Sequence, residues 1–388
     1  MESGSTGEPE KAGLSSKRLE LAYGIWRKAV EEGKVMGCTL RISKDGKPLE
    51  PQALGRKTIE GDSPVQPDTI FLVASVTKPV TATAAMMLVE RGSIRLDDPV
   101  CSIVPEFGDG GRRDRILVRH LLTHTSGLPD QLPENRELRS NHATLDDFLR
   151  KIYKTPILFE PGTSFSYSSS GMAMLMDIVQ HVSGLSLAEF GRREIFQPLG
   201  MDDTSFGVNW DKSERVSQIN IPTSSFQYGE ADAVNWNWNS RYWWSLGSPW
   251  GGMASTQADL TKFLSMFLKG GGLGARQILS PETVRAMTSD QVEAFPSIPK
   301  EVRHGHPWGL GWQLKTPFNA MFGDLVSPRT FGHWGATGTL VWADPRTSLT
   351  CVILTNQPFE GIATLMGRFS NAVAGSVVAP RSLSLPDR

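Results

Sequence analysis

The spacing of apolar residues near the start of the chain predicts a helix followed by a strand hairpin. After Ser15 or Ser16, apolar residues recur at intervals of three and four, which predicts a helix that ends at Gly33. Residues 38–42 alternate as in a half-buried strand, and the Asp-Gly pair at 45–46 is typical of a hairpin turn.

A second apolar stretch, residues 71–74, leads into Ser75. From Ser75 to about Arg91 the sequence is that of a long apolar helix, and Gly92 is placed to close it. We therefore expect Ser75 to open this helix.

Helical segments joined by turns rich in glycine and proline fill the middle of the chain, from about 93 to 235. No clear strand pattern interrupts them. The segments include residues 119–123, 144–153, 171–182 and 187–196.

The strand pattern returns after about residue 330. Residues 338–343 and 349–355 predict an antiparallel hairpin around Asp-Pro-Arg, and a last helix is expected over 361–377. The two ends of the chain are therefore expected to share one domain, with a cleft between it and the helical middle. We predict a flexible tail over 1–13, a discontinuous α/β domain formed by 14–92 and 236–388, and a mainly helical domain over 93–235.

Composition and charge exclude several classes of partner. The 388 residues hold 40 Lys and Arg against 41 Asp and Glu, a formal charge of −1, so nothing favours binding to nucleic acid or to an anionic membrane. The polar start carries no export signal, and no apolar run approaches the roughly 18 residues that span a bilayer. We expect a cytoplasmic protein with a small-molecule substrate and leave its oligomeric state open.

No metal or cofactor is expected. The three cysteines are far apart and form no CxxC pair. His120 and His124 share a helix face without an acidic partner, and His304 and His306 form only a weak metal pair in a Pro-rich loop.

Ser75 and Lys78 are the first candidates for chemistry. One helical turn apart on the same face, their hydroxyl and amine can meet. Lysine accepts the serine proton only when it is neutral, which takes a fall of about three units from its ordinary pKa of about 10.4, and apolar neighbours favour this fall. The alternative is an N-cap serine followed by a solvated lysine. Ser297 and Lys300 repeat the spacing, but the prolines on either side of Ser297 favour an extended loop.

Tyr167 lies between a Glu-Pro-Gly turn and an expected helix, where its phenol can point into a cleft. Near a lysine ammonium the pKa of a phenol falls from about 10, and the group can then pass protons. The alternative is a half-buried tyrosine with a satisfied hydroxyl.

Residues 331–338, Phe-Gly-His-Trp-Gly-Ala-Thr-Gly, are dense in glycine beside a strand. Such a segment lets a substrate approach backbone N–H groups, which can stabilise an oxyanion. His333 is placed either to donate a hydrogen bond to the substrate or to be a satisfied histidine on an edge strand.

Tryptophan is concentrated in one segment. Five of the eleven tryptophans lie between residues 236 and 250, among them Trp243, Trp244 and Trp250. Their setting among glycine, asparagine and serine predicts an aromatic wall folded over the cleft, with core packing as the alternative.

Together these motifs resemble those of the serine β-lactamase and penicillin-binding-protein superfamily. Within it, the chain is most similar to the class C-like branch and to the family VIII carboxylesterases. The resemblance covers about 15–360 and rests on Ser75-Val-Thr-Lys78, Arg119-His-Leu-Leu-Thr-His-Thr-Ser-Gly127, Glu160-Pro-Gly162, Tyr167-Ser-Ser169, residues 251–260 and Gly332-His-Trp-Gly335.

The resemblance implies an α+β fold of the β-lactamase type: a central antiparallel sheet flanked by helices, an all-helical domain, and an active site in the cleft between them. It also implies that Ser75 is the acylated nucleophile and that Lys78 activates it. Tyr167 would act with Lys78 as base and then as acid to the leaving group. The N–H groups of Ser75 and Ala336 would form the oxyanion hole.

Two departures from the family pattern bear on the substrate. His333-Trp334-Gly335 stands where β-lactamases have Lys-Thr-Gly, so the fixed positive charge for a substrate carboxylate is missing. Ser169 replaces the asparagine of the tyrosine motif. Both favour hydrolysis of carboxylic esters with short or compact acyl groups, with β-lactam hydrolysis at most a weak side activity. The alternatives are a D-amino-acid amidase or peptidase, a class C-type β-lactamase, and a non-catalytic binding member of the fold.

Overall fold

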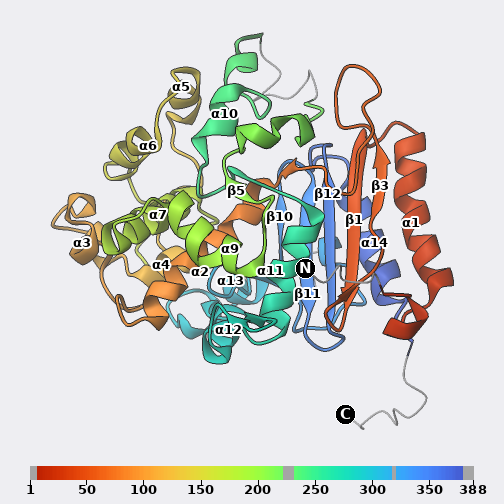
Figure 1. Ribbon diagram of the computed structural model, residues 1–388. Helices are drawn as coiled ribbons and strands as arrows, with labels where there is room; N and C mark the ends of the chain where they lie inside the picture. Colours follow the sequence, from red (N-terminus) through yellow and green to blue (C-terminus); the bar gives the residue numbers. More distant parts are fainter. Residues whose placement is uncertain (1–6, 222–230, 317–319, 379–388) are drawn as a thin grey trace, which may run out of the picture.

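The structure, a computed structural model, describes residues 7–221, 231–316 and 320–378 and combines helices with antiparallel strands (Figure 1). The α-helices are α1 (Ser16–Glu31), α2 (Thr77–Glu90), α3 (Val100–Ile103), α4 (Val118–Leu122), α5 (Asn135–Ser140), α6 (Leu145–Ile152), α7 (Ser169–Ser183), α8 (Leu187–Gly191), α9 (Gln197–Leu199), α10 (Arg241–Leu246), α11 (Gln257–Leu268), α12 (Pro281–Met287), α13 (Lys300–Gly305) and α14 (Ala363–Ala374). The strands are β1 (Gly37–Lys44), β2 (Lys47–Pro48), β3 (Gln52–Gly55), β4 (Phe71–Leu72), β5 (Ser205–Phe206), β6 (Met253–Ser255), β7 (Gly272–Leu273), β8 (Arg276–Gln277), β9 (Gln313–Leu314), β10 (Phe331–Gly335), β11 (Thr339–Asp344) and β12 (Leu349–Thr355). Within these ranges, no helix is both long enough and apolar enough to cross a membrane.

Strands from the two ends of the chain form one antiparallel sheet. Its order is β2-β1-β12-β11-β10-β9, and β3 also pairs with β1. The predicted first helix and both predicted hairpins are confirmed as α1, β1–β2 and β11–β12. Side chains alternate across the sheet, so that Leu340 and Trp342 pack in one cluster while Val341 and Ala343 pack in another.

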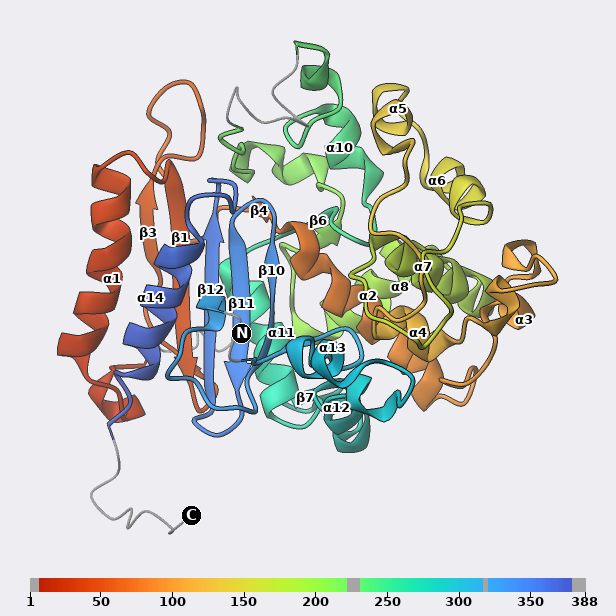
Figure 2. The same ribbon diagram turned by 180° about the vertical axis from the view of Figure 1, so that it is seen from behind.

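Helices cover both faces of this sheet. On one face, α1 and α14 pack together and bury Trp26 and Phe369 (Figures 1 and 2). On the other face, α11 packs against β11 and β12 and buries Phe263 and Leu264. Both views show α3 to α7 at the end of the molecule opposite α1.

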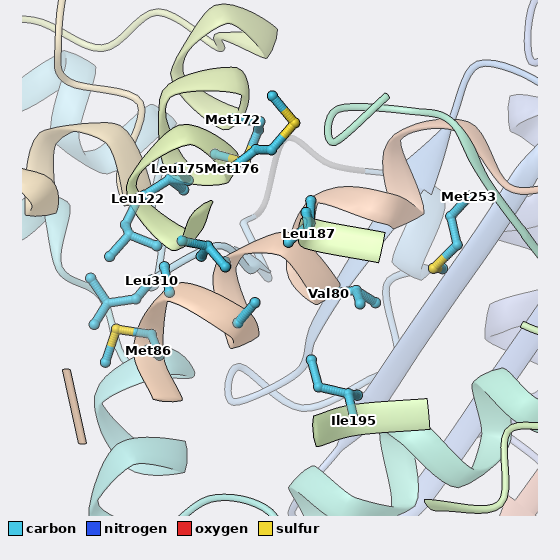
Figure 3. Packing of buried hydrophobic residues seen from close by; sticks show 14 of the residues in the cluster. Val80, Met86, Leu122, Met172, Leu175, Met176, Leu187, Ile195, Met253 and Leu310 are labelled. Carbon is cyan, nitrogen blue, oxygen red and sulfur yellow. The ribbon is translucent and has the colours of Figure 1, made fainter. Parts of the chain in front are cut away.

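Helix α2 runs through the middle of the helical region. Its residues from Thr77 to Leu88 are buried, and it packs against α7. Figure 3 shows Val80 and Met86 of α2 gathered in one hydrophobic cluster with Met172 and Leu175 of α7. A helix that is apolar on all sides must be covered on all sides, so the apolar sequence of this segment fits its central position.

Residues 7–13 differ from the flexible tail that the sequence predicts. Glu10–Ala12 form a 3₁₀ turn, and the Gly7 N–H donates to the Pro48 carbonyl at 2.9 Å. The physical reason is burial, because the apolar residues Ala12 and Leu14 join the cluster beneath α1 and α14. Residues 1–6 of the predicted tail lie outside the described residues.

In the described part of the middle segment, one strand occurs where the sequence predicts only helices. β5 pairs with β6, and the two form a three-stranded sheet with β4. A strand of two residues is too short to show a period of two, so no alternation marks it in the sequence.

Candidate active site

Ser75 lies on a tight turn between β4 and α2. Ala74–Val76 form a 3₁₀ turn, and α2 begins at Thr77, two residues later than the sequence predicts. Ala74 has a φ of 45°, a left-handed conformation that costs a residue with a side chain about 1–2 kcal/mol. The Thr77 hydroxyl donates to the Ala74 carbonyl at 2.6 Å and so holds the turn. The backbone around Ser75 is therefore fixed in a strained conformation, as is common at functional sites.

The amine of Lys78 is buried against Ser75. Its Nζ lies 2.9 Å from Ser75 Oγ and 2.8 Å from the carbonyl oxygen of Trp250, and the residue is only 1% exposed. Burial lowers the pKa of Lys78 to about 7, and the negative charge of Asp130 opposes this effect. Near neutral pH the amine is therefore neutral in a large fraction of molecules, and it can accept the Ser75 proton across this contact.

Tyr167 completes a group of three side chains. Lys78 Nζ lies 4.6 Å from the centre of the Tyr167 ring, and Ser75 is near enough to the phenol to affect its pKa. The expected fall in the pKa of Tyr167 is wrong. Burial raises its pKa, and the neighbouring Ser75 only opposes that rise. Tyr167 is therefore a neutral phenol that can donate a proton, and the structure brings the three predicted groups together.

The end of β10 lies against the turn that carries the serine. Thr337 Oγ1 donates to the Leu72 carbonyl at 2.6 Å, and Thr339 Oγ1 donates to the Val73 carbonyl at 2.9 Å. A Cβ at Gly335 would collide with the same Val73 carbonyl oxygen. Only glycine therefore allows this close approach.

Two backbone N–H groups, those of Ser75 and Ala336, are available as donors near the nucleophile. The hydrogen bonds of the described residues include none from the N–H of Ser75 or the N–H of Ala336. Unused N–H groups are what an oxyanion hole requires.

His333 and Trp334 lie on opposite faces of β10. The His333 ring is buried, with its centre 6.0 Å from that of Tyr167, and its Nδ1 lies 2.8 Å from the Trp334 carbonyl oxygen. Burial and the nearby Lys78 lower the pKa of His333 to about 3, so the ring is neutral. Trp334 stacks on Phe359 at 4.4 Å, on the α1 and α14 side of the sheet. Of the motif His333-Trp334-Gly335, the Trp334 side chain therefore points away from Tyr167, because neighbouring strand residues point to opposite faces.

The three tryptophans predicted to form an aromatic wall lie in different surroundings. Trp243, on α10, packs in a hydrophobic cluster with Ile70 and Leu72. The centre of its ring lies 4.3 Å from the guanidinium carbon of Arg139. Trp244 donates its indole N–H to the Trp238 carbonyl. Among the three predicted tryptophans, the contacts of the described residues join only Trp250 to the site, and they do so through its backbone carbonyl.

Ser169 contacts a carboxylate that the sequence analysis missed. Its N–H and its hydroxyl both donate to Asp130 Oδ1, at 2.9 and 2.7 Å. The Ser169 hydroxyl is therefore engaged by Asp130. No motif marks Asp130, which lies on a loop before α5.

His124 is a second residue that the sequence analysis assigned no role. Its Nδ1 accepts the Ser168 N–H at 3.1 Å, and its ring centre lies 4.7 Å from that of Tyr167. Burial lowers the pKa of His124 well below its usual value, so the ring is neutral. The residue supports the loop that carries Tyr167, and its place in the motif at 119–127 is the sequence signal that could have indicated this.

The second Ser-x-x-Lys pair does not form a comparable site. Ser297 lies in an exposed turn, and Lys300 is exposed at the start of α13. The described hydrogen bonds include none between them, so the Pro-rich loop separates the two groups as the sequence predicts.

Comparisons with known proteins agree with this geometry. The family model described as Beta-lactamase matches residues 24–371, so the chain belongs to the β-lactamase family, within the serine hydrolases of the β-lactamase and penicillin-binding-protein type. A relative from Escherichia coli (strain K12), named "Putative D-alanyl-D-alanine carboxypeptidase", is 28% identical over 391 residues, which are 92% of this chain and 86% of the relative.

Solved structures show the same fold. A penicillin-binding-protein homologue from Caulobacter crescentus has a TM-score of 0.77 and 24% identity over 94% of this chain and 99% of its own. A family VIII carboxylesterase has a TM-score of 0.73 and 21% identity over 92% of this chain and 98% of its own. The predicted family and fold are confirmed.

Proposed function

We propose that the protein hydrolyses carboxylic esters with short or compact acyl groups through an acyl-enzyme formed on Ser75. The observation that carries the proposal is the 2.9 Å contact between Ser75 Oγ and the buried amine of Lys78. A serine hydroxyl needs such a base before it can attack a carbonyl carbon.

The reaction takes two acyl transfers. Ser75 Oγ attacks the ester carbonyl while Lys78 accepts its proton, and the N–H groups of Ser75 and Ala336 stabilise the oxyanion. Tyr167 donates its proton to the departing alkoxide and regains one from Lys78. Water then attacks the acyl-enzyme by the same proton path and releases the acid. General acid–base help is worth about 10²–10⁴ in rate and each oxyanion donor about 10²–10³.

The charges around the nucleophile support an ester over a substrate that carries a carboxylate. His333, at the position of the family's lysine, is neutral because its pKa lies at about 3. Asp130 adds a negative charge on the Ser169 side. A β-lactam or peptide carboxylate therefore meets no fixed cation in these places.

A second candidate function is D-alanyl-D-alanine carboxypeptidase activity. The name of the Escherichia coli relative favours it. A substrate panel separates the two: kcat/KM for p-nitrophenyl butyrate should exceed that for nitrocefin and for a D-alanyl-D-alanine peptide by at least about tenfold. A higher value for either of the latter would contradict the ester assignment.

Labelling separates an enzyme from a binding protein of this fold. An organophosphate should form one adduct on Ser75, located by peptide mass spectrometry. A protein that remains unlabelled on Ser75 and turns over no ester would be a non-catalytic member.

The rate should depend on the protonation of Lys78. With a pKa of about 7, its neutral fraction rises as pH increases through 7, so kcat/KM for a neutral ester should rise about tenfold per pH unit below 7 and level off above it. Initial rates between about pH 5.5 and 9 test this. A midpoint near 10 would mean that the amine is not desolvated and would contradict Lys78 as the base.

A further inference from the structure

A small cavity lies next to residues that contact the catalytic group, and the mechanism makes no use of it. Its walls include Asp130, Phe148, Ser169 and Trp250. Trp250 forms the link to the nucleophile, because its carbonyl oxygen accepts a hydrogen bond from Lys78 Nζ at 2.8 Å. Ser169 forms a second link, since it begins α7 two residues after Tyr167. These links, and the effect of the Asp130 charge on the pKa of Lys78, place the cavity next to the catalytic group.

Asp130 is the single charged side chain on the cavity wall. Its Oδ1 accepts two hydrogen bonds from Ser169, whereas no hydrogen bond to its Oδ2 occurs among the described residues. The wall contains no lysine, arginine or histidine to neutralise this carboxylate. An oxygen atom of a carboxylate thus remains available to a donor from the substrate.

The rest of the wall favours a small cation. The rings of Phe148 and Trp250 lie 5.3 Å apart, and aromatic faces attract cations. The cavity volume of about 20 Å³ is enough for one group of the size of water. That volume is enough for a primary ammonium, the smallest alkylammonium group.

We propose that the substrates are esters that carry a primary ammonium group, which Asp130 binds in this cavity. This inference rests on the proposed ester hydrolysis and specifies its substrate class. Because a charge-assisted hydrogen bond is stronger than a neutral one, the ammonium form should be preferred over a neutral isostere by about tenfold or more. A carboxylate at the same position should be disfavoured, because it would face Asp130.

Isosteric esters test the proposal. Ethyl 6-aminohexanoate and ethyl heptanoate differ by an ammonium in place of a terminal methyl group, and 5-aminopentyl butanoate and hexyl butanoate place the same change on the alcohol side. Acid release is measured by titration at about pH 9, where alkylammonium groups remain charged and Lys78 is neutral. Asp130→Asn keeps an oxygen for Ser169 but removes the charge. Asp62→Asn, an exposed residue outside this cavity, is the matched control.

The ratio of kcat/KM for the ammonium ester to that for its neutral isostere is the readout. In at least one pair it should be about ten or more in the wild type, fall towards one in Asp130→Asn and stay unchanged in Asp62→Asn. Ratios near or below one in both pairs, or ratios that Asp130→Asn leaves unchanged, overturn the inference while ester hydrolysis stands. If the wild type hydrolyses none of the four esters, the proposed function fails, and this inference fails with it.

Discussion

Replacing Ser75 by alanine is expected to lower kcat/KM for p-nitrophenyl butyrate by about 10⁴-fold or more, because no other described group takes the place of its oxygen beside Lys78. The loss should appear in kcat, since a group that forms a covalent bond acts mainly on the chemical step. Steady-state kinetics of the purified variant measure it, and circular dichroism shows whether the fold is retained.

The matched control is Ser297→Ala. Ser297 has the same spacing to a lysine but lies in an exposed turn, so its replacement should change kcat/KM by less than about twofold. Full activity in Ser75→Ala together with a large loss in Ser297→Ala would reverse the assignment of the nucleophile.

Replacing Lys78 by methionine is expected to remove activity and to stabilise the fold. Loss of the base should lower kcat/KM by about 10²–10⁴-fold. The pKa of Lys78 falls from its ordinary value of 10.5 to about 7 in the folded protein. At pH 7 this fall lowers the free energy of unfolding by about 4–5 kcal/mol, and the methionine variant does not have this cost. The variant also leaves the Trp250 carbonyl without its hydrogen-bond donor, which costs about 1–3 kcal/mol. The free energy of unfolding is therefore expected to increase by a net amount of about 2 kcal/mol.

The gain in stability should depend on pH in one direction. Above pH 10.5 the amine is neutral in both folded and unfolded chains, and burial costs nothing extra. The cost grows as the pH falls and is complete below about 7, so the difference between variant and wild type should shrink from pH 7 to pH 9. Urea denaturation at several pH values measures it, with the exposed Lys17→Met as control. A variant that is less stable than the wild type, or a difference independent of pH, would show that Lys78 is not held neutral by burial.

The family and the chemical triad could be predicted because short sequence intervals encode them. Ser75 and Lys78 are three residues apart, and the glycine-rich run at 331–338 is continuous, so both can be recognised without knowledge of the loops. Strand alternation alone places Trp334 opposite His333, although the two are neighbours in the motif.

Other parts of the site could not be predicted, because they depend on how distant segments meet. Asp130 accepts hydrogen bonds from Ser169, which lies 39 residues further along the chain, and no spacing rule connects the two. The pKa of Tyr167 rises because burial excludes water from the phenol, and local sequence does not specify that burial.

The hydroxyls of Thr337 and Thr339 bind the carbonyls that precede the nucleophile, so the hairpin that carries Ala336 and the turn that carries Ser75 are clamped into one rigid unit. The walls of the proposed substrate cavity, which include Asp130, Phe148 and Trp250, lie outside that unit. Substitutions in those walls can therefore retune selectivity while the spacing of the reacting atoms is preserved, which makes this scaffold a suitable starting point for engineering new substrate preferences.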